Sequence, residues 1–90
     1  MRHELKIAPK YFVGVDRGVK KFEIRKDDRP FKTGDTLWLR EYKFPGEYTG
    51  LWVCALVTDV FRDPGFGLQD GYCIMSIEVT NWGSDVDEVP

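Results

Sequence analysis

The segment 18–25 contains the charged side chains with the clearest chemical potential in this chain. It places Lys20, Glu23 and Arg25, and so an ammonium, a carboxylate and a guanidinium, in one short stretch. An arginine can bind a phosphate or a base edge through two parallel hydrogen bonds, which a lysine cannot do. A carboxylate can accept a hydrogen bond from an exocyclic amine, as it does with cytosine. These residue types are therefore suited to a cleft for a nucleotide-like ligand.

The way a strand alternates its side chains decides where these charges point. On a strand, Glu23 and Arg25 share one side, and Phe22 and Ile24 share the other. We expect the apolar side to anchor the strand to the core and the charged side to line the site. The same pattern also fits a cluster of salt bridges that binds no ligand.

Lys20 is an even number of residues away from Phe22 and Ile24, so on one continuous strand it would point to their apolar side. It can reach the charged side only if the backbone at Lys20 is not part of the strand. Pro9 suits the first turn of a helix, and Gly18 suits the position that ends one. The sequence therefore predicts a short helix from Pro9, with an apolar stripe at Phe12, Val13 and Val15. Lys20 joins the cleft if the following strand begins after it, with Lys20 still in the turn that Gly18 opens.

Further cations and aromatic residues extend this candidate site. Lys26 and Arg29 add positive charge, although Asp27 and Asp28 lie among them and partly cancel their field. Exposed aromatic side chains could stack on a base. The positive surface also includes Lys32, and the candidates for stacking are Tyr42, Tyr48 and Trp52.

The composition describes one small globular domain with an uneven charge distribution. The chain has 90 residues, of which 42% are hydrophobic, and a net charge of −2. Residues 1–43 hold twelve Lys and Arg against seven Asp and Glu, whereas residues 44–90 hold one against eight. Two readings stay open, since the two halves either neutralise each other or present a basic patch to an anionic partner.

Short strands separated by turns predict an α+β, mostly β domain. Five or six strands with one or two short helices favour a small β-barrel, which would also remove exposed sheet edges. An open α+β sheet is the alternative. We expect one domain over residues 1–81 and an acidic, fraying tail over 82–90. The predicted strands cover 3–7, 20–26, 36–42, 51–62 and 72–80.

The remaining residues that could do chemistry have simpler interpretations. Cys54 and Cys73 are expected as two buried thiols, although a disulfide between them is possible. The single histidine, His3, is expected at the surface or at a strand end, and without a Cys/His cluster we expect no zinc site. Nothing else in the sequence implies a metal or an organic cofactor. Four large aromatic residues are expected in the core. They are Phe12, Phe22, Trp38 and Phe61.

The apolar runs bear on location and partners. None approaches the roughly 18 apolar residues needed to cross a bilayer, and the amino terminus lacks the apolar stretch of a signal peptide. We therefore expect a soluble cytoplasmic protein, monomeric, with no membrane partner.

The octet Gly18-Val-Lys-Lys-Phe-Glu-Ile-Arg25 resembles the Gly-x-Lys-x-x-Glu-x-Arg signature of ASCH domains, relatives of the PUA fold. The turn Phe31-Lys-Thr-Gly-Asp35 resembles the one that follows this signature in ASCH proteins. The opening His-Glu-Leu-Lys-Ile, the Arg-Glu-Tyr at 40–42 and the closing Gly-Tyr-Cys-Ile-Met-Ser-Ile-Glu are similar to an uncharacterised ASCH-like subfamily of bacteria and phages. The resemblance covers residues 3–79.

This resemblance implies a β-barrel with flanking helices and a cleft for RNA or a nucleotide-like small molecule. The ligand-binding residues would be Lys20, Glu23, Arg25, Lys26 and Arg29. Some small ASCH proteins hydrolyse acylated cytidines with a lysine, a threonine and a glutamate. Lys20 matches that lysine, but Glu23 stands at the threonine position and the glutamate has no counterpart. We therefore expect a binding module, with an amidohydrolase using Lys20 and Glu23 as one alternative and a protein-interaction module as another.

Overall fold

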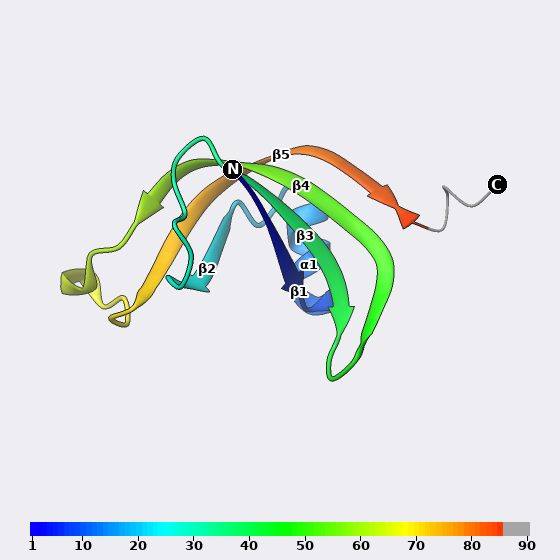
Figure 1. Cartoon of the computed structure of the whole chain (residues 1–90), viewed down its shortest axis with the longest axis horizontal. Coiled ribbons are helices and arrows are strands. Elements are labelled where there is room, and N and C mark those ends of the chain that lie inside the picture. Colours follow the sequence, from blue (N-terminus) through cyan, green and yellow to red (C-terminus); the bar gives the residue numbers. More distant parts are fainter. Residues whose placement is uncertain (86–90) are drawn as a thin grey trace.

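The computed structural model describes residues 1–85, and strands make up most of them (Figure 1). The apolar periodicity predicted the position of each strand to within a few residues, and only the ends differ. The elements are, in chain order, β1 (Arg2–Ile7), α1 (Pro9–Asp16), β2 (Phe22–Lys26), β3 (Thr36–Lys43), β4 (Glu47–Phe61), the 3₁₀ turn η1 (Pro64–Phe66) and β5 (Tyr72–Ser84).

The five strands form one curled sheet in the order β1-β3-β4-β5-β2. β1 runs parallel to β3, and the other neighbouring pairs are antiparallel. In Figure 1, β4 and β5 arch over α1, so the sheet is a half-barrel. The predicted mostly β fold with one short helix is confirmed. The curl stops short of closure, so β1 and β2 remain as edges that do not pair with each other.

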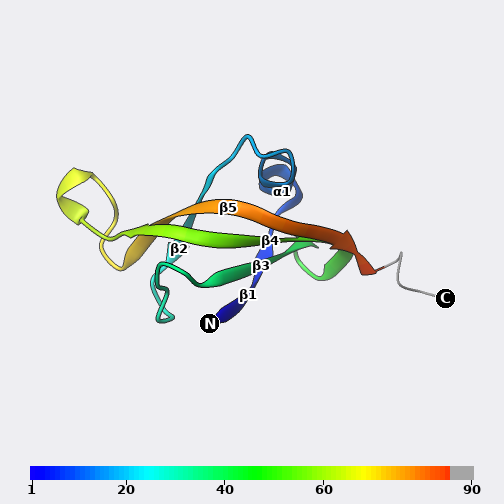
Figure 2. The same cartoon turned by 90° about the horizontal axis from the view of Figure 1, so that it is seen from above.

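The core fills the concave side of the sheet. Every second residue of β3, β4 and β5 turns inward, because side chains alternate along a strand. The helix covers this side with Phe12 and Val15, and Figure 2 shows it lying next to β5. The fully buried side chains are largely aliphatic, and they include Leu37, Leu39, Val53, Val57, Met75 and the aromatic Phe31.

Of the four aromatic residues expected in the core, only Phe12 is buried. Trp38 is half-buried, and Phe22 and Phe61 are exposed. The register explains the error, since Phe61 lies opposite Ile74 on the outer face of the sheet. Aliphatic side chains fill most of the core, and the only phenylalanines in it among the described residues, Phe12 and Phe31, come from the helix and from the loop before β3.

The last strand is longer than expected. Trp82, Gly83 and Ser84 pair with β4, so the sheet includes the first residues of the predicted tail. A Cβ atom on Gly83 would lie 2.5 Å from the ring of Trp52, so a glycine is needed for this close contact. The fraying expected for the rest of the tail concerns residues 86–90, which lie outside the described range.

The two cysteines cannot form a bond with each other in this fold. Cys73 turns into the core, whereas Cys54 lies on the opposite side of the sheet and pairs in register with Asn81. Both are free thiols, and burial raises the pKa of each. Among residues 1–85 there is no cluster of three side chains able to hold a metal ion, and no helix is long and apolar enough to span a membrane.

A buried polar pair joins the start of β1 to the turn before β3. His3, expected at the surface or at a strand end, is the second residue of β1 but is only 4% exposed, because it shares the inward side of β1 with Leu5. Its Nε2 lies 2.8 Å from Asp35 Oδ2, and its ring packs edge-on against Phe31. Asp35 also accepts hydrogen bonds from the backbone N–H of Lys32 and from the amino terminus. These contacts hold the loop 27–35 against β1.

Asp35 should therefore make the stability of the fold depend on acid. Its contact with His3, together with its other donors, lowers its pKa from 3.8 to about 2. A carboxyl with a depressed folded pKa stabilises the fold above its unfolded pKa, and that contribution is lost as the pH falls towards the folded pKa. We expect the free energy of urea unfolding to fall more steeply between about pH 4 and pH 2 in the native chain than in Asp35→Asn. Equal slopes for the two chains would contradict this assignment.

Candidate ligand-binding groove

The connection between α1 and β2 positions Lys20. β2 begins at Phe22, so Lys20 precedes the strand, as its reach to the cleft requires. After Gly18, whose φ is +71°, the chain folds back and the backbone N–H of Lys20 donates to Gly14 O at 2.9 Å. A Cβ on Gly14 would lie 3.1 Å from Lys20 Cβ. Glycine is unfavourable inside a helix, but here it allows the chain to pack closely over the helix.

β2 presents its charged side chains, not its apolar ones, to the concave side of the sheet. Glu23 lies opposite the core residue Met75 in the register with β5. Glu23 is 3% exposed, whereas Phe22 and Ile24 are 43% and 52% exposed. The expectation that the apolar side anchors β2 to the core is therefore wrong. Because the sheet does not close, the inward positions of its edge strand β2 face a seam between β2 and β1. The ion pairs of Glu23 offset the free-energy cost of removing its carboxylate from water.

Glu23 binds two cations at once. Lys20 Nζ donates to Oε1 at 2.7 Å, and Arg25 Nε donates to Oε2 at 2.9 Å. Lys20 Nζ also donates to the backbone oxygen of Phe22. With both oxygens engaged, Glu23 orients the two cations towards one place.

Arg25 is held at one end of its guanidinium and is available at the other. Within residues 1–85, Nε is the one nitrogen of this side chain that donates to a protein acceptor. The two terminal nitrogens keep their donors for a ligand. Because Nε is fixed, this fork is already oriented, which suits a phosphate, a carboxylate or a base edge.

The seam between β1 and β2 forms a groove with two neighbouring cavities. Lys6 of β1 and Arg25 of β2 line both cavities, so the two are adjacent. One of them, which we name the apolar-rimmed cavity, has a volume of about 520 Å³. Its lining combines the charged cluster with exposed apolar side chains. These residues are Lys6, Ile7, Ala8, Tyr11, Lys20, Phe22, Glu23, Ile24, Arg25 and Phe44.

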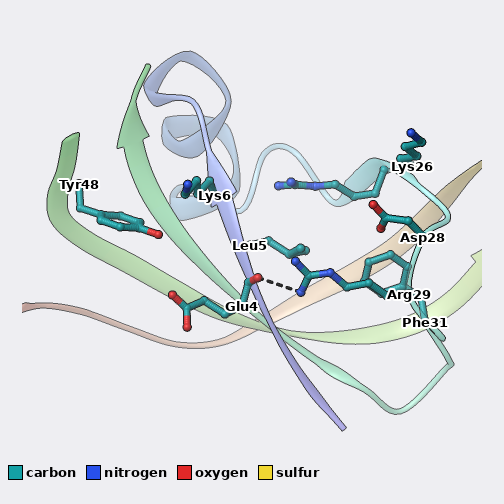
Figure 3. A pocket seen from close by; sticks show the side chains of 9 residues that line it. Glu4, Leu5, Lys6, Lys26, Asp28, Arg29, Phe31 and Tyr48 are labelled. Carbon is teal, nitrogen blue, oxygen red and sulfur yellow. Dashed lines mark hydrogen bonds between the residues drawn. The ribbon is translucent and has the colours of Figure 1, made fainter. Parts of the chain in front are cut away.

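The other cavity, which we name the cationic cavity, has a volume of about 610 Å³. In Figure 3, Tyr48 lies on one side of β1 and Lys26, Asp28 and Arg29 lie on the other. Arg29 Nη1 donates to the backbone oxygen of Glu4 at 3.0 Å, which ties the loop to β1. The lining residues are Glu4, Leu5, Lys6, Arg25, Lys26, Asp28, Arg29, Phe31 and Tyr48.

Two carboxylates near the cationic cavity are already paired with cations outside it. Glu4 Oε2 accepts from Arg40 Nη1 at 2.8 Å, and Asp27 Oδ2 accepts from Arg62 Nε at 2.6 Å. These contacts raise the pKa of both guanidinium groups. Asp27 therefore does little to cancel the neighbouring cations, whereas the carboxylate of Asp28 lines the cavity itself. Four cations against Asp28 and the paired Glu4 leave the lining with a positive balance.

All five residues predicted to bind a ligand line this groove. Lys20 and Glu23 line the apolar-rimmed cavity, and Lys26 and Arg29 line the cationic one. Arg25 lies at the boundary and lines both. The structure thus brings together residues from the α1–β2 connection, from β2 and from the loop after it. Lys32, also expected on the positive surface, lines neither cavity.

Lys6 is a groove residue that sequence reasoning missed. Because Lys6 alternates with the buried Leu5 along β1, the sequence predicts an ordinary surface lysine. Lys6 lines the groove only because β1 lies across from β2 in the folded sheet. Its Nζ lies 4.5 Å from the centre of the Tyr42 ring. Of the aromatic residues predicted to stack on a base, Tyr48 lines the cationic cavity, whereas Tyr42 and Trp52 line neither cavity.

Comparisons with known proteins find similarity over most of the chain. A profile described as a domain of unknown function, DUF3850, matches residues 2–77, which include every residue that lines the two cavities. An uncharacterised 12.9 kDa protein in the GpA 3′ region of Escherichia phage P2 is 48% identical over 58 residues. That match covers 64% of this chain and 52% of the phage protein, so the chain spans about half the length of this relative.

The orientation of β2 predicts how substitutions rank in stability. Glu23→Gln leaves two cations without their buried counter-charge, and we expect a loss of about 1–3 kcal/mol in the free energy of unfolding. Phe22→Ser changes an exposed side chain, so we expect a loss below about 1 kcal/mol. Urea denaturation of the two variants beside the native chain measures both. The reverse order would mean that Phe22, not Glu23, anchors β2.

Proposed function

We propose that this chain, which belongs to the DUF3850 family, is a module that binds RNA or a nucleotide-like small molecule in the groove between β1 and β2. The proposal includes kinship with ASCH domains, on the strength of the octet 18–25. The resemblance to uncharacterised phage proteins is supported by the phage P2 relative. Lys20, Glu23, Arg25, Lys26 and Arg29 are the binding residues on this proposal.

The observation that supports it most is the state of the Arg25 guanidinium. Its Nε is fixed by a buried carboxylate, while its terminal nitrogens have no acceptor within residues 1–85, at the point where two cavities meet. A preoriented guanidinium loses less conformational freedom when it binds an anion. A salt-bridge cluster that only stabilised the fold would have no need to leave this fork open towards a groove.

The overall charge favours a compact ligand over a long duplex. A protein that coats phosphate backbones usually has a large positive balance, and this chain has a net charge of −2. Five of its thirteen Lys and Arg line the groove. Three of these, Lys6, Lys26 and Arg29, make no salt bridge within the described residues. A nucleotide or a few nucleotides of single-stranded RNA suit this distribution.

Amide hydrolysis of acylated nucleosides is the second candidate. The contact of 2.7 Å between Lys20 and Glu23 favours it, since an adjacent ammonium and carboxylate can act as acid and base in a cavity of nucleoside size. Against it, both oxygens of Glu23 are engaged by cations, and the third residue of that chemistry has no counterpart. Incubation with N4-acylated cytidines at high protein concentration is the test. We expect no release of the acyl group, and turnover abolished by Lys20→Ala would establish the hydrolase instead.

A protein-interaction module was the third candidate, conditional on one continuous acidic face in the second half of the chain. Glu47 lies in the β3–β4 hairpin, whereas Asp63 and Asp70 flank η1 at the other end of β4. Figure 1 shows these two regions well apart. The arrangement therefore gives this candidate little support.

Arg25 provides the direct test of the binding proposal. We expect Arg25→Ala to weaken the binding of ribonucleoside monophosphates and short single-stranded RNA by about tenfold or more, because charge-assisted hydrogen bonds are lost. Arg25→Lys keeps a cation beside Glu23 but loses the two terminal nitrogens of the guanidinium. Its affinity should therefore lie between those of the native chain and of Arg25→Ala. Titration calorimetry at low salt measures the affinities.

Arg17→Ala is the matched control, since it removes an exposed guanidinium that lines neither cavity. It should bind as the native chain does, and circular dichroism should show every variant folded. Native affinity in both Arg25 variants, or an equal loss in Arg17→Ala, would refute a role for the fork. No binding by the native chain even at low salt would refute the proposed function itself.

A further inference from the structure

The two cavities of the groove differ in the kind of chemical group that each can take. They share Lys6 and Arg25, yet their other lining residues belong to different classes. Across the seam, the apolar-rimmed cavity lies between the end of β1 and the start of β2, and the cationic cavity lies between the middle of β1 and the loop after β2. One ligand that lies along the seam therefore meets two environments in sequence.

The apolar-rimmed cavity fits a flat ring. Tyr11, Phe22, Ile24 and Phe44 surround it, and all four are exposed, up to 64% for Phe44. Exposed aromatic side chains beside a cavity offer stacking surfaces to a base. Glu23 lines the same cavity and is 3% exposed. Each of its oxygens accepts from one cation and keeps a second lone pair, which can accept from the polar edge of such a ring. This combination of apolar walls and a few polar groups is typical of small-molecule sites.

The cationic cavity fits a phosphate. Its lining holds four cations against two carboxylates, and one of the carboxylates, Glu4, is already paired with Arg40. The cations are Lys6, Arg25, Lys26 and Arg29, and the second carboxylate is Asp28. Arg29 uses Nη1 to bind the Glu4 backbone oxygen, which leaves its other nitrogens as donors within the described residues. Guanidinium groups bind phosphate through paired hydrogen bonds, and lysines add charge. Tyr48, which also lines the cavity, can contribute its hydroxyl group.

We infer that the groove divides one ligand between these cavities, with a base in the apolar-rimmed cavity and the adjoining phosphate in the cationic cavity. This inference rests on the proposed function and narrows it to a class. The unit recognised is a nucleoside phosphate, either as a free mononucleotide or as one nucleotide of a single strand. Arg25 spans the boundary and contacts the ligand where base and phosphate are joined through the sugar. A nucleoside without phosphate fills only half of the site.

Titration calorimetry with matched probes tests this division. The probes are cytidine, guanosine, adenosine and uridine, their 5′- and 3′-monophosphates, inorganic phosphate, and tetranucleotides of single-stranded RNA. We expect at least one monophosphate to bind about tenfold tighter than both its nucleoside and inorganic phosphate. The reason is that the nucleoside alone and inorganic phosphate alone each occupy only one of the two cavities. A preference for the free monophosphate over the tetranucleotide identifies a mononucleotide ligand, and the reverse order identifies an RNA strand, either of which supports the inference.

Variants on the two sides of the boundary give a second, independent readout. Arg29→Ala should lower the affinity for the monophosphate about tenfold and leave the affinity for its nucleoside unchanged. Phe44→Ala should lower both affinities. Lys32→Ala is the matched control for Arg29→Ala, since it lies in the same loop and lines neither cavity. It should change neither affinity.

Equal affinities for a nucleoside and its monophosphate, or an equal loss of both in Arg29→Ala, would overturn the two-part site while leaving nucleotide binding intact. If no nucleoside, nucleotide or RNA binds, the proposed function fails and the inference with it. The two failures are thus distinguishable in one set of titrations.

Discussion

The buried carboxylate of Glu23 is the constraint on which the groove depends. A charge that is 97% removed from water must be paired, and Glu23 is paired twice, with Lys20 and with Arg25. One partner comes from β2 itself and the other from the connection that precedes it. The pairing therefore joins two segments and orients both cations. It also turns the charged side of β2 inward and leaves Phe22 and Ile24 outside.

The groove exists because the sheet curls without closing. β1 and β2 are edges at opposite ends of the strand order, and the curl brings them to face each other across a seam. A closed barrel would use the backbone groups of both edges in strand pairing and leave no space between them. Two further contacts complete one wall of the groove. Asp35 holds the loop 27–35 to β1, and Arg62 holds the start of that loop through Asp27.

Much of this was readable from residue types, and the errors share one cause. The octet 18–25 and the two cations after it, Lys26 and Arg29, supplied five binding candidates, and all five line the groove. The helix end near Gly18 followed from local backbone rules, whereas the predicted strand 20–26 began two residues earlier than β2 does. Which side of β2 points inward did not follow from local rules, because alternation defines two sides of a strand and does not say which one is buried. The burial of His3 was missed for a related reason, since its partner Asp35 lies far along the chain.

Residue types and their spacing were enough to locate the strands, the helix and the candidate cations, because these depend on side-chain periodicity and on the conformations that Pro and Gly allow. Only the tertiary structure decided that the sheet remains open, that Glu23 faces inward and that Lys6 joins the site. Each of these depends on β1 and β2 meeting across a seam. That meeting arises from the curl of the whole sheet, and no local pattern encodes it.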